Sequence, residues 1–359
     1  ARDLYETEPV FAEWMDRGLD MLQPRLDYDI RAVWLPDADG LAEAQERLKR
    51  PSVQLPLIMI TEYALAQLWQ SWGVTPAALI GHSMGENTAA CLAGVMSFDD
   101  CIGLVHLRGQ LFDEVAPGGM LSVPLAAEAL RPWLGEGLDL AAVNAPELSV
   151  ASGPQAALDD LAARLAAEGI EAQRIPIDIA AHSRMLEPIL DRFRAFLASM
   201  TLNPPQVPLI SNRTGDYMTP EQATDPDYWV GHLRHTVEYA KGLGRLARDE
   251  ARVFLEVGPG KALSSLAQAH DAISANQVIG SLRHPDDVVP DDEYFMAMLG
   301  RMWAVGVIID WDQIWGDARR YRVPVPTYAF QHKPYFITPG AARNEVATDF
   351  PLRRDDLEE

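Results

Sequence analysis

The stretch GHSMGENTAA, residues 81–90, places a serine between two glycines directly after the apolar run of residues 77–80. Gly-x-Ser-x-Gly at a strand-to-helix turn lifts a serine hydroxyl clear of the end of a sheet. The small residues that follow predict a helix, and the N–H of Met84 at its start is a candidate oxyanion donor. The stretch therefore predicts an α/β fold with Ser83 as a nucleophile. The alternative is a helix-capping serine in a motif that occurs by chance.

The composition predicts a protein of the reducing cytoplasm. The 359 residues are 48% hydrophobic, which suits one large domain or two or three smaller ones. No apolar run approaches the ~18 residues of a membrane span, and the polar start ARDLYETEP gives no sign of a signal peptide. A net charge of −22 argues against binding nucleic acid or anionic membranes. Cys91 and Cys101 lie in apolar helical patterns and are predicted to be buried free thiols.

The order of patterns along the chain predicts one domain inserted into another. Residues 118–184 read as strand, helix, strand, strand, helix and strand, the order of a ferredoxin-like sandwich. Residues 1–117 and 185–305 alternate helical and strand-like patterns and form the two halves of a larger α/β domain. Residues 306–340 predict an extended strap that packs on a surface, and the charged residues 341–359 a disordered tail.

Arg108 is the most informative residue after Ser83. A helix is predicted to begin at Ser97, and Arg108 falls on its apolar face. A buried guanidinium without an anion costs several kcal/mol, so a negative group should meet it. Two interpretations are open: an ion pair with an internal carboxylate, or a bidentate clamp for the carboxylate of a substrate.

A nucleophilic serine needs a base, and the histidines are the candidates. His182 follows the last ferredoxin-like strand, where the chain returns to the large domain, and a crevice between domains is a favoured place for a site. His82 adjoins Ser83, but neighbours in a tight turn generally point apart. No His/Cys/Asp/Glu cluster has metal-ligand spacing.

Taken together, these motifs resemble those of the acyltransferase domains of type I polyketide synthases and, more distantly, of the malonyl-CoA:acyl carrier protein transacylases. The resemblance runs from residue 3 to about 337, and it rests on motifs in the family's order: RDLYETEPVF, QLPLIMITEYAL with Gln54, GHSMGE, LRGQLF with Arg108, IAAHS with His182, SNRTG, YWVGHLR, EVGPGKAL and VPVPTYAFQHKPYF. It implies an α/β-hydrolase-like large subdomain with an inserted ferredoxin-like small subdomain. Residues 306–340 then correspond to the linker that follows such domains.

The resemblance implies a Ser-His dyad in which backbone carbonyls near His232, in place of an acid, orient the base His182. Ser83 then attacks the thioester of a carboxyacyl-CoA, and Arg108 holds the free carboxylate. Met84, Gln54, His82 and Ala181 are the further residues expected at the substrate.

The implied second substrate is the phosphopantetheine thiol of an acyl carrier protein, which takes the acyl group from the serine. No cofactor is expected to be bound, because the CoA thioester is a substrate and phosphopantetheine belongs to the carrier. The ketosynthase and other domains of the same synthase are the remaining expected partners.

The chain departs from the family pattern in two places. Family members begin with a strand and a Gly-Gln-Gly turn that supplies a second oxyanion donor, and the sequence starts just past that point. The tetrapeptide that ends in the catalytic histidine is usually HAFH in malonyl-selective members and YASH in methylmalonyl-selective ones, whereas here residues 179–182 are IAAH. Ala181 leaves room for an α-methyl, but Met84 resembles the malonyl type, and we therefore expect malonyl over methylmalonyl.

Two other functions remain open on the sequence. An esterase or thioesterase of the α/β-hydrolase type would need the order Ser, acid, His, with His270 or His284 as its base. A folded but inactive scaffold segment is the second.

Docking of an acidic carrier protein on this acidic chain would need a local basic patch. The candidates are Arg319, Arg320 and Arg322, or Arg234 with His235 and Lys241; each group is otherwise ordinary solvated charge.

Overall fold

The computed structural model describes residues 1–249, 251–318 and 321–333. Residues Ala1–Gly316 form one compact unit. Residues 321–333, which belong to a second unit, contain no helix or strand. None of the helices in the described ranges combines the length and the apolar character needed to cross a membrane.

The N-terminal part of the unit is helical. Its helices are α1 (Arg2–Thr7), α2 (Pro9–Leu22), α3 (Ile30–Trp34), α4 (Leu41–Arg47), α5 (Pro51–Ser71), α6 (Met84–Leu92) and α7 (Phe98–Glu114). The predicted start of α7 is confirmed, because the Ser97 hydroxyl oxygen accepts the N–H of Asp100 at 3.1 Å. Cys91 and Cys101 are buried and free, as predicted.

The small subdomain has the predicted ferredoxin-like order. Its elements are β1 (Gly119–Val123), α8 (Ala127–Leu134), β2 (Asp139–Ala145), β3 (Leu148–Gly153), α9 (Gln155–Ala167) and β4 (Gln173–Ile175). The sheet order is β2-β3-β1-β4, and every pair is antiparallel. The last strand is shorter than the predicted run over residues 170–180, because Pro176 has no N–H to continue the ladder.

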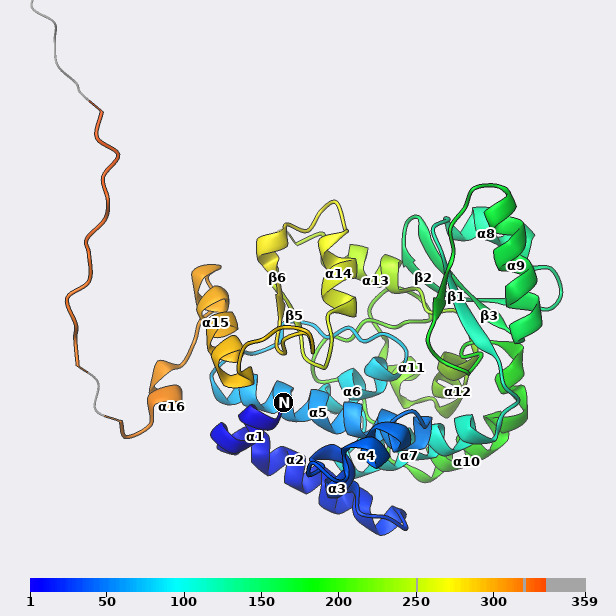
Figure 1. Cartoon of the computed structure of the whole chain (residues 1–359), viewed down its shortest axis with the longest axis horizontal. Helices are drawn as coiled ribbons and strands as arrows, with labels where there is room; N and C mark the ends of the chain where they lie inside the picture. The colour runs from blue at the N-terminus through cyan, green and yellow to red at the C-terminus, as the bar shows by residue number, and fades with distance from the viewer. Residues whose placement is uncertain (250, 319–320, 334–359) are drawn as a thin grey trace, which may run out of the picture. The chain divides into compact units, whose positions relative to one another are not determined.

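The two faces of this sheet serve different cores. Leu121 and Val123 of β1 pack with leucines of α8 and α9 into a small separate core. Met120 of β1 and Val150 of β3 face the opposite way and join the main core. Figure 1 shows α8 and α9 on the outer side of the sheet, away from the long helices α5 and α7. The inner face of the sheet is therefore available to form one wall of a site.

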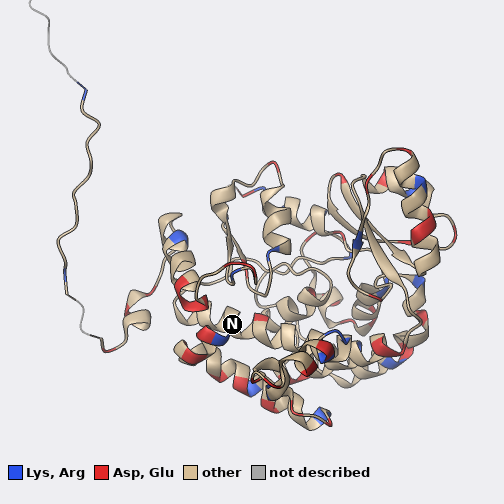
Figure 2. Cartoon of the chain, in the orientation of Figure 1, with Lys and Arg blue, Asp and Glu red and all other residues tan. Residues whose placement is uncertain are grey.

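The chain then returns to the large subdomain. Its remaining elements are a 3₁₀ helix η2 (Arg184–Ile189), α10 (Leu190–Ser199), α11 (Pro220–Thr224), α12 (Pro226–Arg234), α13 (Tyr239–Leu246), β5 (Phe254–Glu256), α14 (Ala262–Gln268), β6 (Val278–Gly280), α15 (Asp291–Ala304) and α16 (Trp311–Trp315). Strands β5 and β6 pair in parallel. Figure 2 shows acidic residues along most of the outer helices, with Lys and Arg between them.

Two predicted strands of the large subdomain are only partly formed. Residues 77–80 and 207–212 meet in a single parallel bridge, Leu79↔Leu209, with the Leu79 N–H donating to the Pro208 carbonyl at 2.8 Å. Among the described residues Leu209 is the one bridge partner recorded for residues 77–80, which also line a cavity. A two-stranded parallel pair is marginal without further strands.

The predicted strap at residues 306–340 contains the short helix α16 and is therefore not extended throughout. Residues 334–340 of the strap and the predicted tail, 341–359, lie outside the described residues. The domain boundaries stay predictions.

Candidate active site

The turn that carries Ser83 is tight and strained. Ser83 has φ 53° and ψ −117°, a region that side chains rarely adopt, and it immediately precedes α6. A Cβ on Gly81 would lie 2.1 Å from the carbonyl carbon of Gly85, so only glycine fits there. A Cβ on Gly85 would meet nothing within 4 Å. The first glycine of the motif is therefore required by packing, and the second is not.

Asn212 holds this turn from outside the motif. Its side-chain oxygen accepts the N–H of Ser83 at 2.8 Å, and its side-chain nitrogen donates to the Gly81 carbonyl at 2.8 Å. The backbone N–H of Asn212 donates to the Glu86 carboxyl at 2.7 Å. Asn212 lies in the motif SNRTG and Glu86 lies in the motif GHSMGE. The spacing of residues in these motifs indicates no role for either side chain. The available signal was the pair of polar residues, Ser211 and Asn212, that follows the apolar run VPLI.

Ser83 and His182 meet across the two subdomains. The Ser83 hydroxyl lies 2.7 Å from His182 Nε2, and His182 Nδ1 lies 3.0 Å from the His235 carbonyl. A carbonyl only accepts, so Nδ1 carries the proton and Nε2 is free to accept one from Ser83. His182 itself has φ 56°, a second strained residue beside Ser83.

The surroundings of His182 keep it neutral. Burial, followed by the positive charge of Arg108, lowers the pKa of His182 to about 3. The imidazole is therefore uncharged near neutral pH and can accept a proton.

The carbonyl that orients His182 belongs to His235, whereas His232 was the predicted orienting residue. His235 is the first residue after α12, and its extended backbone (φ −97°, ψ 168°) takes its carbonyl out of the helix. The backbone of His232 raises the pKa of His182 as well, with a smaller effect than that of His235. The His232 ring lies 6.2 Å from the His182 ring, and its Nε2 is 3.5 Å from the Glu86 carboxyl.

Arg108 is 2% exposed and points at the serine. One terminal nitrogen donates to the Ser83 hydroxyl oxygen at 2.8 Å, and the other donates to the Asn87 side chain at 3.1 Å. Its Nε has no hydrogen-bond partner, and none of the carboxylates in the described ranges forms an ion pair with it. Burial lowers the pKa of Arg108 to about 10, so the group stays charged near neutral pH. Of the two open interpretations, the structure does not contain the internal ion pair.

Glu86 is a buried carboxyl behind the site. Besides the Asn212 N–H it contacts the Tyr228 hydroxyl at 2.6 Å, and burial raises the pKa of Glu86 to about 8. The Glu86 carboxyl is thus largely protonated and uncharged at neutral pH. It therefore does not act as a permanent internal counter-ion of Arg108.

A cavity of about 910 Å³ opens in front of Ser83, His182 and Arg108. All of the predicted substrate residues line it: Gln54, His82, Met84, Arg108 and Ala181. The His82 ring is held from the small subdomain, with Nε2 2.7 Å from the Asn144 side-chain oxygen. The inner face of the small sheet contributes Met120 and Val150 to the wall.

The N–H of Met84 is a free donor at the N-terminal start of α6. The Ser83 N–H is taken by Asn212, and the N–H groups of Gly85 and Glu86 donate to the carbonyls of His82 and Ser83. Within the part of the chain that the structure describes, the Met84 N–H has no acceptor. It is available to an oxygen that carries developing negative charge beside Ser83.

No group of three or more His, Cys, Asp or Glu side chains among the described residues could hold a metal ion.

The family model for the acyl transferase domain matches residues 1–302. The chain belongs to this family. It is 35% identical over 345 residues to a phenolphthiocerol/phthiocerol polyketide synthase protein of Mycobacterium tuberculosis, covering 95% of this chain and 22% of that protein. The chain therefore spans about a fifth of the length of this curated relative.

Solved structures agree with this assignment. The acyl transferase domain of ZmaA superimposes with a TM-score of 0.84 at 36% identity, covering 90% of this chain and 75% of that one. The malonyl CoA-acyl carrier protein transacylase of Clostridium perfringens matches with a TM-score of 0.72 at 22% identity, covering 85% and 93% of the two chains, and shows a shared fold. The predicted two-subdomain α/β fold is confirmed.

The structure also places the histidines of the esterase interpretation and residues of the two candidate basic patches. Neither His270 nor His284, required by the esterase interpretation, lines the cavity. Arg234 is paired with Glu187 at 3.2 Å, and the Lys241 ammonium donates to a backbone carbonyl at 2.6 Å. Whether either group docks a carrier stays a prediction. Of the other candidate group, Arg319 and Arg320 lie outside the described residues, and Arg322 is exposed.

Proposed function

We propose that this acyltransferase domain transfers a carboxyacyl extender unit from CoA to Ser83 and then to the phosphopantetheine thiol of an acyl carrier protein. One observation carries the proposal: the Ser83 hydroxyl lies between the free Nε2 of His182, at 2.7 Å, and the guanidinium of Arg108, at 2.8 Å. A neutral base supports a nucleophilic serine, and a buried cation that pairs with no carboxylate of the described residues supports a substrate with a free carboxylate.

In the proposed first half-reaction, His182 Nε2 takes the hydroxyl proton as Ser83 Oγ attacks the thioester carbonyl. The N–H of Met84 donates to the resulting oxyanion. The carbon–sulfur bond then breaks, and the CoA thiolate takes the proton back from His182. Arg108 leaves the Ser83 hydroxyl to bind the carboxylate in a bidentate pair.

In the second half-reaction, the carrier thiol gives its proton to His182 and attacks the acyl-serine. The Ser83 oxygen leaves and recovers that proton. Ketosynthase and other domains of a longer synthase are the partners that such a reaction would serve. The buried free thiols of Cys91 and Cys101 support a reducing compartment, and we place the reaction in the cytoplasm.

We further propose that malonyl is preferred to methylmalonyl. Met84 after the nucleophile favours malonyl, while the small Ala181, which lines the cavity, leaves space for a branch. A competition between the two CoA thioesters tests this preference, and a larger yield of the methylmalonyl adduct overturns it.

The experiment that tests the function is the intact mass of the protein after mixing with malonyl-CoA or methylmalonyl-CoA, beside Ser83→Ala. The expected result is a carboxyacyl adduct that is absent from the variant. Free CoA without an adduct would indicate hydrolysis, and no reaction would indicate an inactive scaffold.

A further inference from the structure

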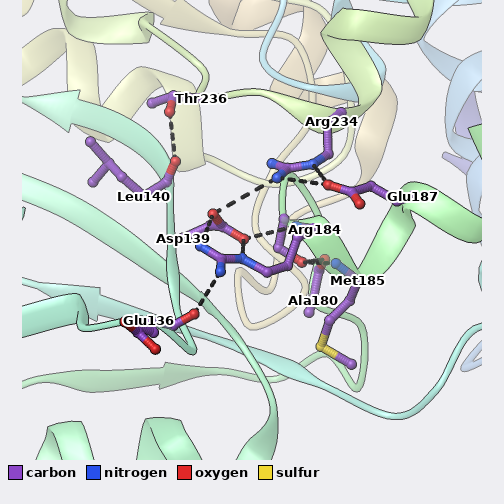
Figure 3. A network of polar contacts seen from close by, with 10 residues as sticks. Glu136, Asp139, Leu140, Ala180, Arg184, Met185, Glu187, Arg234 and Thr236 are labelled. Atoms are coloured by element: carbon purple, nitrogen blue, oxygen red, sulfur yellow. Dashed lines mark hydrogen bonds and ion pairs between the residues drawn. The ribbon is translucent and has the colours of Figure 1, made fainter.

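The outer edge of β2 is bound to the segment that follows α12. The Thr236 hydroxyl donates to the Leu140 carbonyl at 2.6 Å, as Figure 3 shows. The Val237 N–H donates to the Ala141 carbonyl at 2.9 Å, and the Val143 N–H donates to the Val237 carbonyl at 2.9 Å. The small sheet thus continues by one parallel bridge into the large subdomain.

Asp139, the first residue of β2, binds Arg184 at the start of η2 and Arg234 at the end of α12 (Figure 3). Its carboxylate accepts both Nε and a terminal nitrogen of Arg184 at 3.1 Å, and the backbone N–H of Arg184 at 2.8 Å. A terminal nitrogen of Arg234 lies 3.9 Å away and also pairs with Glu187. Burial raises the pKa of Asp139, but the hydrogen bonds from Arg184 and the charge of Arg234 outweigh it, and the net pKa is lowered.

Arg184 and Arg234 each lie close in sequence to one partner of the hydrogen bond between His182 Nδ1 and the His235 carbonyl. Arg184 lies two residues after His182, and Arg234 directly precedes His235, whose carbonyl accepts the His182 Nδ1 proton. The residue after that carbonyl, Thr236, is itself bound to β2. A single carboxylate of the small subdomain therefore holds both chain segments that set the position of the His182 ring.

His182 needs such support because its backbone lies at φ 56°, where a residue with a side chain persists only if its surroundings hold it. The side chains of Asp139 and Arg234 are 17% and 19% exposed, while that of Arg184 is 48% exposed, so water competes less at Asp139 and Arg234 than at the open ion pairs of the surface.

We propose that Asp139 is a positioning residue for the transfer reaction: from the small subdomain it holds His182 and the His235 carbonyl in register beside Ser83. The inference rests on the proposed function and extends it. Acyl transfer then depends on the subdomain boundary staying closed at β2, because opening there would separate the base from the carbonyl that orients it.

The test compares Asp139→Asn with the matched control Asp159→Asn. Asp159 belongs to the same subdomain and pairs with Arg174, but its side chain is 75% exposed and far from the network in sequence. The measurements are the rate of CoA release on acylation of Ser83, the KM for malonyl-CoA, the urea midpoint and the pH dependence. The ¹⁵N chemical shifts of the His182 ring, assigned against His182→Gln, report the tautomer without any need for activity.

For Asp139→Asn we expect kcat to fall about 10- to 100-fold, as for a displaced catalytic group, with KM within about threefold of wild type. The acidic limb of kcat/KM should move upward as water reaches the ring, which is faced by Arg108 of α7, by His82 and Ser83 of the turn, and by His232 of α12. The His182 resonances should show mixed tautomers. Asp139→Glu should recover part of the rate.

Equal kinetics and equal ring shifts in Asp139→Asn and Asp159→Asn would overturn the inference, as would a rise in KM with kcat unchanged. Should Asp139→Asn not fold, Arg184→Gln decides, because it removes the bidentate side-chain contact and leaves Asp139 with Arg234 and with the backbone N–H of residue 184. A wild-type protein that releases no CoA would refute the proposed function, whereas the ring shifts would still show whether Asp139 sets the tautomer.

Discussion

Replacing Asn212 by alanine removes the clamp on the nucleophile turn. The side chain is 1% exposed and makes two hydrogen bonds of 2.8 Å to the turn, one to the N–H of Ser83 and one to the carbonyl of Gly81. Leaving both groups buried without partners would cost about 1–3 kcal/mol each. The strained backbone of Ser83 stores ~1–3 kcal/mol, which the turn would recover by relaxing and which offsets part of this cost. We therefore expect the free energy of unfolding to fall by about 1–3 kcal/mol.

The expected effect on the reaction is of the same size as the effect on stability. A relaxed turn moves the Ser83 hydroxyl away from His182, and a displacement of about 1 Å costs ~10²-fold in rate. The assay is the first-turnover release of CoA, with urea unfolding measured on the same protein. Asn203→Ala is the matched control, because Asn203 is exposed and its side chain contacts none of the described residues through a hydrogen bond.

Asn212→Asp makes the test sharper. When protonated, the introduced carboxyl can accept from Ser83 N–H and donate to the Gly81 carbonyl, as the amide does; when ionised it can only accept. Burial raises the pKa of such a carboxyl, so the variant should be most active at low pH and lose activity as the pH rises from about 5 to about 8. An Asn212→Ala variant with wild-type acylation rates, or an Asn212→Asp variant with a wild-type pH profile, would refute the reasoning.

Four further predictions follow from the same geometry. Gly81→Ala should abolish folding or acylation because its Cβ meets the Gly85 carbonyl at 2.1 Å, whereas Gly85→Ala should be tolerated; thermal unfolding and CoA release compare the pair. Arg108→Ala should lower kcat/KM for malonyl-CoA by about 10²–10⁴-fold, from two charge-assisted hydrogen bonds of about 1.5–3 kcal/mol each, and acetyl-CoA, which has no carboxylate, should lose far less in the same assay. The wild-type kcat/KM for malonyl-CoA should stay level until the pH falls toward the pKa of His182, about 3, and should decline at high pH as Glu86, with a pKa of about 8, ionises and becomes a counter-ion of Arg108; a limb near pH 6.5 would contradict it. Glu86 keeps a proton in the folded state between pH 4.5 and about 8 that the unfolded chain has lost, so its stabilising contribution declines as the pH rises through that window; Glu86→Gln should flatten this part of the urea-derived stability profile relative to wild type.

The sequence by itself was sufficient for the fold class and for the residues that now meet at the cavity. Gly-x-Ser-x-Gly between an apolar run and a helix is a local pattern, and the apolar face around Arg108 follows from helical spacing within α7. The ferredoxin-like order was also readable, because each of its strands and helices has its own periodicity. The functional roles of the residues at the cavity are proposals, which acylation of Ser83 would establish.

Only the tertiary structure decided what holds these residues in place. Asn212 lies 129 residues after Ser83, Glu86 contacts Tyr228, and Asp139 reaches Arg184 and Arg234 across the subdomain boundary. The backbone carbonyl that accepts from His182 Nδ1 belongs to His235, three residues after the expected His232, and only the fold shows which carbonyl of this segment reaches the ring. Hydrogen bonds between segments so far apart depend on how α12, β2 and the nucleophile turn pack against one another, and that packing leaves no periodic trace in the sequence.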